Sequence, residues 1–188
     1  MEAIDALKNR TSSPRLTGDT PNKIALETIF QAAMRAPDHA QLRPWRFLLV
    51  EGGDRQKLGD LFVKAKREDN SLLTEAEIEK TRNKTLRGPL ILVAIVSVQA
   101  HPKVPEIEQV LSAGAAIQNI LLAAYALDIG AIWRTGSMAF HPTVKSGLGL
   151  TSNEKIAGFV YIGDRQGKER QLTPMDSQRY FESWPKKL

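Results

Sequence analysis

Apolar residues follow one another almost without interruption over residues 89–98, PLILVAIVSV. Many of them are β-branched, and such a run is typical of a central strand that is covered on both faces. Shorter apolar segments at 47–50, 130–134 and 156–162 predict three further strands. The pattern therefore predicts a sheet built around the 89–98 strand.

Apolar residues at helical spacing predict helices over 3–8, 21–36, 55–66, 75–86, 106–127 and 143–148. Thr20 is expected to cap the second of these helices, with Pro21 at its first position. Its buried face is expected to comprise Ile24, Leu26, Ile29, Phe30 and Ala33. Thr74 and Glu77 have the spacing of a capping box before the fourth helix, and Pro142 begins the last one.

The 106–127 helix is apolar almost all the way round in its second half. Gln118, Asn119 and Tyr125 interrupt it too often for a membrane span, so a buried central helix is expected. Residues 112–116, SAGAA, are small enough for another backbone to approach closely. They favour packing against a partner subunit and packing within the chain about equally.

The predicted helices outnumber the strands, and strands and helices do not alternate regularly. This order favours an α+β domain over a doubly wound fold, with residues 1–188 as a single domain. The segment 164–188 forms a polar C-terminal arm that carries Tyr180, Phe181 and Trp184. Aromatic side chains seldom stay in water, so the arm is expected to pack on its own core or to wrap a partner.

Composition narrows the class of protein. The 42% hydrophobic and 25% charged residues are typical of a globular chain, and the absence of cysteine excludes disulfides, thiolate nucleophiles and zinc–thiolate sites. The net charge of +5, from 26 basic and 21 acidic residues, is spread along the chain, which disfavours nucleic-acid binding. The segment MEAIDALKNR has no signal-peptide run, so a cytoplasmic protein without a membrane segment is expected.

Three segments combine positive charge with hydrogen-bonding groups. The first runs from Arg10 to Arg15 and places hydroxyls between two guanidinium groups, the donors that a phosphate needs. The second, "MRAPDHAQLRPW", joins a helix to a strand, and the third, "AIWRTG", is a strand end that leads into a glycine turn. Each segment alone has an ordinary structural explanation, as a solvated loop or as core, but together they indicate an anionic ligand.

Several other chemistries lack their motifs. No glycine-rich dinucleotide loop follows a strand and no Walker loop is present, which excludes the common dinucleotide and ATP folds. His39, His101 and His141 do not have metal-ligand spacing, so no metal is expected. No serine lies in a nucleophile elbow, which leaves hydrolase chemistry without support.

In order along the chain, "RTS" at residue 10, "RAPDHAQLRPW", "HPKVPEIEQVLSAG" and "IWRTG" resemble the FMN-dependent nitroreductase family, within it the short YdjA-like branch. The resemblance covers about residues 4–163. It implies a mixed central sheet flanked by helices and an intertwined homodimer whose interface binds FMN through residues of both subunits. It also implies NADH or NADPH as co-substrate and a nitroaromatic or quinone-like small molecule as electron acceptor.

By the same resemblance, Arg10, Thr11 and Ser12 would hold the phosphate and ribityl groups of FMN, with Arg134 reaching the phosphate. The full implied set of cofactor-binding residues is Arg10, Thr11, Ser12, Arg35, His39, Trp133, Arg134 and Thr135. No catalytic side chain is expected, since flavin N5 carries the chemistry. Residues 64–86 are expected to lie over the active site as a helical excursion.

Two positions depart from the common family pattern. Gln41 and Arg43 stand where smaller or neutral polar residues are frequent, and both are possible additional cofactor contacts. Arg43 either adds positive charge beside the flavin, which would raise its reduction potential, or points to solvent. A flavin-binding or flavin-storage protein without catalysis is the alternative function on the same fold.

Overall fold

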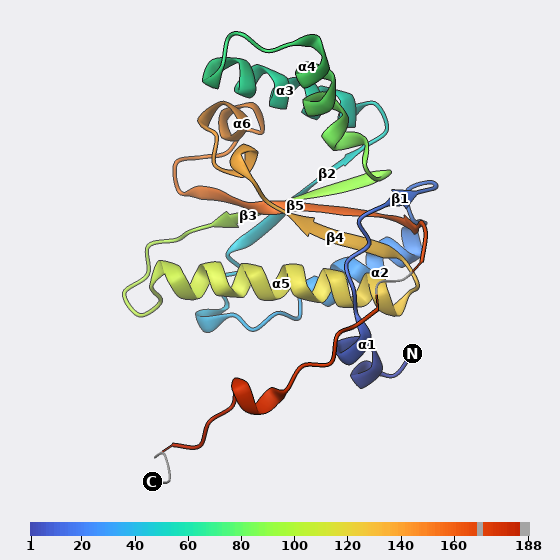
Figure 1. Cartoon of the computed structure of the whole chain (residues 1–188). Helices are drawn as coiled ribbons and strands as arrows, with labels where there is room; N and C mark the ends of the chain where they lie inside the picture. Colours follow the sequence, from blue (N-terminus) through green and yellow to red (C-terminus); the bar gives the residue numbers. More distant parts are fainter. Residues whose placement is uncertain (169–170, 185–188) are drawn as a thin grey trace.

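The long apolar run forms the central strand of an antiparallel sheet. The computed structural model describes residues 1–168 and 171–184, and its strand order is β1-β5-β3-β2, with β4 also paired to β5 (Figure 1). All of the pairings between the described strands are antiparallel. The strands are β1 (Leu16–Thr17), β2 (Trp45–Glu51), β3 (Leu90–Ser97), β4 (Gly130–Arg134) and β5 (Glu154–Arg165).

Alternation along β3 explains why the run forms a covered strand. Leu90 and Leu92 face one core cluster, whereas Ile91 and Val93 face the other, and all four have no exposed surface. Successive strand residues point to opposite faces, so an unbroken apolar run requires cover on both. The prediction of a central strand is confirmed.

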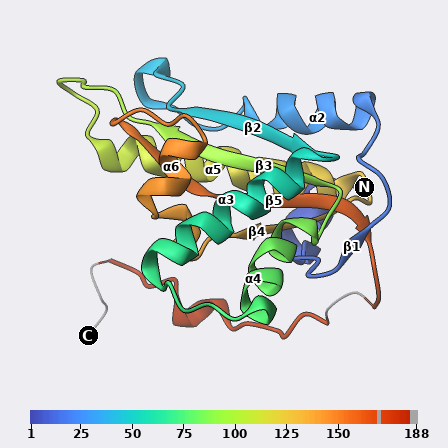
Figure 2. The ribbon, with the colours of Figure 1, turned by 90° about the horizontal axis from the view of Figure 1, so that it is seen from above.

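Helices form a layer on each face of the sheet. Helices α2 and α5 cover one face, and α3, α4 and α6 cover the other, as Figure 1 shows from the side and Figure 2 from above. The helices are α1 (Ala3–Asn9), α2 (Lys23–Ala33), α3 (Asp54–Asp69), α4 (Glu75–Arg82), α5 (Glu106–Ala126) and α6 (Pro142–Gly147). The described residues also form four short 3-10 helices, which are η1 (His39–Gln41), η2 (Asn83–Leu86), η3 (Ser137–Ala139) and η4 (Ser177–Arg179). The α+β prediction is confirmed.

Helix α2 begins later than the sequence predicted. Its cap is Asn22, whose side-chain oxygen accepts a hydrogen bond from the Ala25 N–H at 2.9 Å, so the prediction of Thr20 as the cap was wrong. Ile29 is buried as expected, but Ile24 is 82% exposed. Five positions correspond to about 140° around a helix, so Ile24 and Ile29 cannot share one face.

Helix α5 is the central helix that was expected. It is long and apolar enough by composition to cross a membrane, yet its buried side chains form a core with the sheet. Ala113 and Ala116 of the small-residue segment are buried within the chain, which confirms intrachain packing for these two. The face that stays open carries Ile107 and Leu111, which are 61% and 65% exposed.

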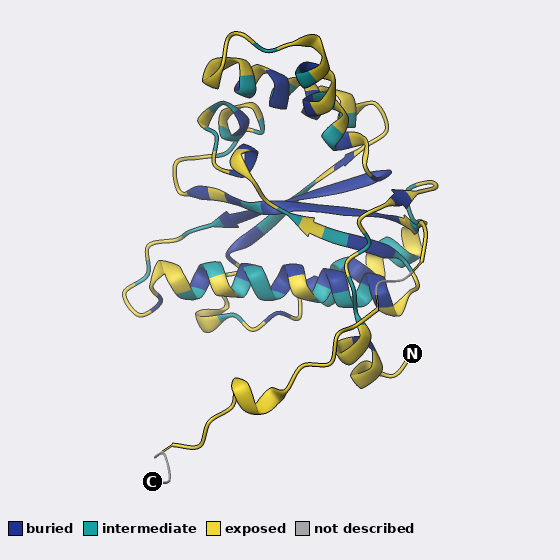
Figure 3. Ribbon diagram, in the orientation of Figure 1, coloured by how far each residue is buried: buried dark blue, intermediate teal, exposed yellow. Residues whose placement is uncertain are grey.

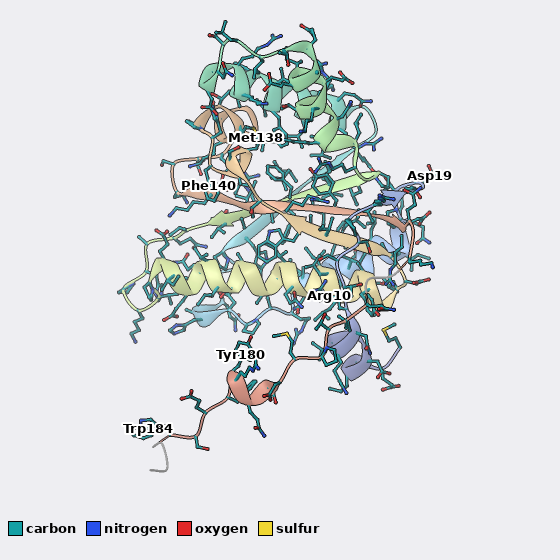
Figure 4. All side chains as sticks on the ribbon, in the orientation of Figure 1. Arg10, Asp19, Met138, Phe140, Tyr180 and Trp184 are labelled. Atoms are coloured by element: carbon teal, nitrogen blue, oxygen red, sulfur yellow. The ribbon has the colours of Figure 1, made fainter. Side chains whose placement is uncertain are left out.

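Two further expectations concern the chain ends and the capping box. Thr74 and Glu77 make the capping box reciprocally at the start of α4, as predicted. The described part of the C-terminal arm leaves the body of the protein, as Figures 3 and 4 show. Tyr180, Phe181 and Trp184 are 68%, 80% and 93% exposed, so the arm does not pack them on its own core.

Candidate functional site

A bulge in β5 shapes the end of β4. The pairing register between β3 and β5 shifts beside Ala94, and Ala157 falls in the shifted stretch. The Ala157 carbonyl accepts a hydrogen bond from the Trp133 indole N–H at 3.1 Å, although Trp133 remains 38% exposed. Bulges commonly redirect side chains next to functional sites. Alternation along β4 places Trp133 and Arg134 on opposite faces, and the bulge supplies the carbonyl that binds the Trp133 indole.

The N-terminal loop lies along the free edge of β4. It begins where α1 ends at Arg10, and the Ser13 N–H donates to the Ala131 carbonyl at 3.0 Å. Further along, the Gln166 N–H donates to the Arg15 carbonyl at 3.2 Å. These backbone bonds bring two of the three charged segments, far apart in sequence, to one edge of the sheet.

A cavity of about 490 Å³ opens at this edge. It is lined by residues 11–14, Ile132 and residues 165–168, and we call it the hydroxyl cavity after Thr11, Ser12 and Ser13. Arg165 and Lys168 contribute positive charge to its wall. Hydroxyls together with cationic side chains are the donors that bind a phosphate group.

Two arginines beside the loop retain buried nitrogen atoms without a hydrogen bond. These atoms are Nη1 of Arg10 and Nε of Arg134, and neither has a partner among the described residues. The Arg134 Nη2 atom is also 3.4 Å from the Pro14 carbonyl, a long contact. A buried donor without an acceptor costs about 1–3 kcal/mol, so both guanidinium groups are suited to an anionic ligand.

A second cavity, of about 410 Å³, lies further along β4 on the α3–α4 side. Lys84, Arg87 and Arg134 line it together with Tyr161 and residues 135–138, and we call it the cationic cavity. Arg134 stacks over the Tyr161 ring at 5.9 Å. Ile132 of the first cavity and Arg134 of the second are alternate residues of β4, so the two side chains point to the same face of the sheet, about 7 Å apart along the strand.

Titratable groups in the cationic cavity are perturbed. Burial raises the pKa of the Tyr161 phenol, and the charges of Arg87 and Arg134 act in the opposite direction. Burial also lowers the pKa of the Lys84 ammonium, with further lowering by Lys66, Arg87 and Lys80. The Lys84 shift shows that cations gather here without a carboxylate to offset them, and perturbed groups of this kind are frequent at functional sites.

The remaining predicted site residues lie elsewhere in the chain. Arg35 lines an apolar groove between α1, α2 and α5, and the His39 Nδ1 atom contacts Glu108 of α5 at 2.7 Å. Gln41 and Arg43 lie in the same loop as His39, and none of these four residues lines either cavity described above. Within one chain, therefore, the fold brings Arg10, Thr11, Ser12, Arg134 and Thr135 to one edge of the sheet, without the second charged segment.

The loop that contains His39 has a strained backbone. Ala40, Gln41 and Arg43 all have positive φ, at 61°, 54° and 49°, and none of them is glycine. The Asp38 carboxylate accepts a hydrogen bond from the Arg43 N–H at 2.6 Å and so helps to hold this conformation. Left-handed non-glycine residues are uncommon and cluster at ligand-binding segments, which makes the loop a second candidate site element.

Sequence reasoning did not identify Lys84, Arg87, Tyr161, Arg165 and Lys168 as lining residues. The sequence does contain a signal for Lys84 and Arg87, because both cations lie shortly before the apolar run that forms β3. Arg165 and Lys168 likewise follow β5, and charges at strand ends often serve ligands. Nothing in the sequence distinguishes Tyr161 from the other apolar positions of its strand.

The fold and this edge together define a class of protein: an α+β domain whose antiparallel sheet has, at one edge, hydroxyl and guanidinium groups of the kind that bind phosphate. The family model described as "Nitroreductase family" matches residues 7–164. The Escherichia coli (strain K12) protein "Putative NAD(P)H nitroreductase YdjA" is 36% identical over 168 residues, which cover 89% of this chain and 91% of that protein. The chain belongs to the nitroreductase family, as its motifs indicated.

Further comparisons agree with this assignment. The Haemophilus influenzae "Putative NAD(P)H nitroreductase" is 33% identical over 182 residues, covering 96% of this chain and 98% of that protein. A nitroreductase-like family protein from Bacillus cereus has a TM-score of 0.83 at 23% identity, over 98% of this chain and 97% of that one. A "putative nitroreductase in complex with fmn" from Desulfovibrio desulfuricans has a TM-score of 0.74 at 23% identity, over 98% and 99% of the two chains. These two structures confirm the fold.

Proposed function

We propose that this protein is an FMN-dependent oxidoreductase that takes hydride from NADH or NADPH and reduces nitroaromatic or quinone-like acceptors. The observation that carries the proposal is a loop of hydroxyls with Arg10 at its start and Arg134 against Pro14 at its end, each with one buried nitrogen atom that lacks a hydrogen bond. The names of two relatives, "Putative NAD(P)H nitroreductase YdjA" and "Putative NAD(P)H nitroreductase", support the same activity.

The residues at the β4 edge fit the phosphate end of FMN. Thr11 and Ser12 offer hydroxyls, and Arg10 and Arg134 offer the charge that a phosphate dianion requires. Arg165 and Lys168 add charge to the same cavity. When bound, FMN supplies the capacity to accept a hydride and to pass it to an acceptor. The protein then has to bind the cofactor, orient it and exclude water, and no side chain is needed as acid or base for hydride transfer.

The second charged segment joins the site through a second copy of the chain. Arg35, His39, Gln41 and Arg43 are exposed, and Trp133 and Thr135 at the end of β4 are exposed as well. The open apolar face of α5 at Ile107 and Leu111 gives a second copy a surface to cover. We therefore assign these residues to a cofactor site shared by two chains of a homodimer, with each chain forming one domain and residing in the cytoplasm.

The test is an absorption spectrum of the purified protein, with the released chromophore identified after denaturation. We expect flavin bands, release of FMN, and bleaching of the bands when NADH or NADPH is added without oxygen. Addition of a nitroaromatic or quinone acceptor should then restore the oxidised spectrum. A colourless protein that does not bind added FMN would overturn the proposal. A yellow protein that neither nicotinamide reduces would instead be a flavin-binding or flavin-storage protein.

A further inference from the structure

Two cations at the proposed site do not belong to the hydroxyl cavity. Lys84 lies in η2, and Arg87 follows it just before β3, on the face that α3 and α4 cover. They line the cationic cavity together with Arg134, and no acidic residue lines that cavity. The segment that carries them thus borders the site on the α3–α4 side of the sheet.

The positive charge around this cavity is not balanced by carboxylates. Lys84, Arg87, Lys66 and Lys80 form no ion pair with any described residue. Their charges reach one another, because Lys66, Lys80 and Arg87 each lower the pKa of the Lys84 ammonium, after burial as the largest cause. We call these four side chains the cationic cluster.

Acidic side chains lie close to the segment that carries Lys84 and Arg87, but they pair with other residues. Arg82, two positions before Lys84, contacts Asp60 at 2.7 Å and Glu79 at 3.2 Å. Glu77 lies close enough to Lys66 and Lys80 for their charges to lower its pKa, after the larger effect of its bonds to Thr74. Its carboxylate is used in the capping box of α4 and does not line the cationic cavity.

Gathering like charges beside a half-buried cavity is unfavourable unless an anion joins them. Repulsion and desolvation both disfavour the charged form of such a group. An anion that enters the cavity reverses both effects, and charge-assisted hydrogen bonds to it are among the strongest available. The cationic cluster is therefore suited to an anionic ligand rather than to a contribution to folding stability.

The position of the cationic cluster indicates which anionic ligand it binds. Arg134, which contacts Pro14 of the hydroxyl cavity, is assigned with Thr11 and Ser12 to the phosphate of FMN. The cationic cavity extends from Arg134 and Thr135 to Lys84 and Arg87. The molecule that must come close to bound flavin from outside is the hydride donor, and a nicotinamide dinucleotide carries a diphosphate. We propose that Lys84 and Arg87, with Lys66 and Lys80 around them, form the docking site for the diphosphate of this dinucleotide. The proposal rests on the proposed function.

The experiment uses the FMN-loaded protein and the double substitution Lys84→Met with Arg87→Met. ADP-ribose, which has the diphosphate but no nicotinamide, is titrated by calorimetry at two salt concentrations. The double variant is expected to bind ADP-ribose at least about tenfold more weakly, and its binding should lose most of its salt dependence. In stopped-flow reduction by NADH, the apparent Kd should rise similarly while the limiting rate of flavin bleaching stays within about twofold.

A donor without phosphates separates recognition from chemistry. The neutral compound 1-benzyl-1,4-dihydronicotinamide should reduce the double variant and the unsubstituted protein at the same rate. Arg82→Met is the matched control, since it removes a cation from the same segment that is already paired with Asp60 and Glu79. This control should keep the affinity for ADP-ribose. The single substitution Arg87→Met, at an exposed position, provides the same test if the double variant folds poorly.

Three outcomes overturn the inference. Unchanged affinity for ADP-ribose in the double variant shows that the cluster does not bind the diphosphate. An equal loss of reduction rate with the neutral donor, or weaker FMN binding without an effect on ADP-ribose, assigns the cations to the cofactor instead. A protein that neither binds FMN nor reacts with the neutral donor overturns the proposed function and this inference with it.

Discussion

Arg46 and Glu154 form a two-point ion pair that joins the ends of two non-adjacent strands. The Arg46 Nε atom lies 2.6 Å from Glu154 Oε1, and its Nη2 atom lies 2.8 Å from Oε2. The same carboxylate accepts hydrogen bonds from the Ser97 hydroxyl at 2.9 Å and from the Thr151 N–H at 3.0 Å. One side chain thus connects β2, β3 and β5 at one end of the three strands.

This pair predicts loss of stability in acid. The hydrogen bond from Arg46 lowers the pKa of Glu154 to about 2, with burial acting against it and Thr151 and Ser97 assisting. As the pH falls below the ordinary pKa of 4.5, the Glu154 carboxylate takes up a proton in the unfolded chain but stays ionised in the folded protein. The contribution to stability is therefore complete above that pH and is lost as the pH approaches 2.

Replacement of Glu154 should reproduce that loss at neutral pH. Glu154→Gln is expected to lower the free energy of unfolding by about 2 kcal/mol in urea titrations at pH 7, because Arg46 keeps only a neutral acceptor. The difference from the unsubstituted protein should shrink at low pH. Glu51→Gln, at an exposed position at the other end of β2, is the control and should change little. A pH-independent difference would contradict the assignment.

The unsatisfied guanidinium groups predict the effect of substitutions on cofactor affinity. Arg134→Met should weaken FMN binding by about 10- to 100-fold, since it removes charge-assisted hydrogen bonds to a phosphate. Arg10→Met should act in the same direction. Arg10→Met should keep or slightly gain stability without FMN, because it loses a buried donor that lacks a partner. In Arg134→Met that gain is offset by loss of the contacts with Pro14 and Tyr161. Quenching of flavin fluorescence on titration with the apoprotein measures the affinity for FMN. If both variants bind FMN as tightly as the unsubstituted protein, these arginines do not belong to the site.

The close approach at Gly158 predicts a severe effect of a single methyl group. A Cβ atom at Gly158 would lie 2.2 Å from Trp133 Nε1 and 2.7 Å from the Arg134 carbonyl, on a residue whose φ is +152°. Gly158→Ala should destabilise the protein by about 3 kcal/mol through overlap and backbone strain. Urea unfolding measures the loss. Gly53→Ala, where no atom lies within 4 Å of the new Cβ, is the control and should be nearly neutral.

The open face of α5 predicts the result of a charge at the proposed dimer interface. Leu111→Glu should convert a dimer into a monomer in light scattering, because it places a carboxylate on an apolar surface that is otherwise covered. FMN binding should weaken in the same variant if residues of both chains form the site. Leu72→Glu is the matched control, since Leu72 is 87% exposed in the turn between α3 and α4. An unsubstituted protein that is monomeric at micromolar concentration would refute the shared site.

Arg43 predicts a shift in flavin potential. If it places positive charge beside the flavin of the second chain, Arg43→Gln should lower the midpoint potential by about 30 mV, the equivalent of a tenfold change in relative affinity for a two-electron couple. Lys57→Gln removes one charge from the exposed surface of α3 and should leave the potential unchanged. Spectroelectrochemical titration measures both, and an unchanged potential in Arg43→Gln would mean that Arg43 faces solvent.

The elements that the sequence determined by itself are those whose signal is local. The β3 run, the capping box at Thr74 and Glu77, the β4 strand and the long α5 helix were each predicted from a single segment. The motifs also indicated the family, because they recur in a fixed order. Local patterns succeed here because hydrophobic periodicity and capping depend on neighbours within a few residues.

Tertiary structure decided what depends on contacts between distant segments. Only the fold shows that Arg10 and Arg134 each retain a buried nitrogen atom without a hydrogen bond among the described residues. It also shows that Lys84 and Arg87, unremarkable in sequence, line the same cavity as Arg134, and that Gly158 leaves room for Trp133. These relationships come from contacts between distant segments, such as the hydrogen bond between Arg134 and Pro14, which are 120 residues apart, and no periodicity encodes which segments will meet.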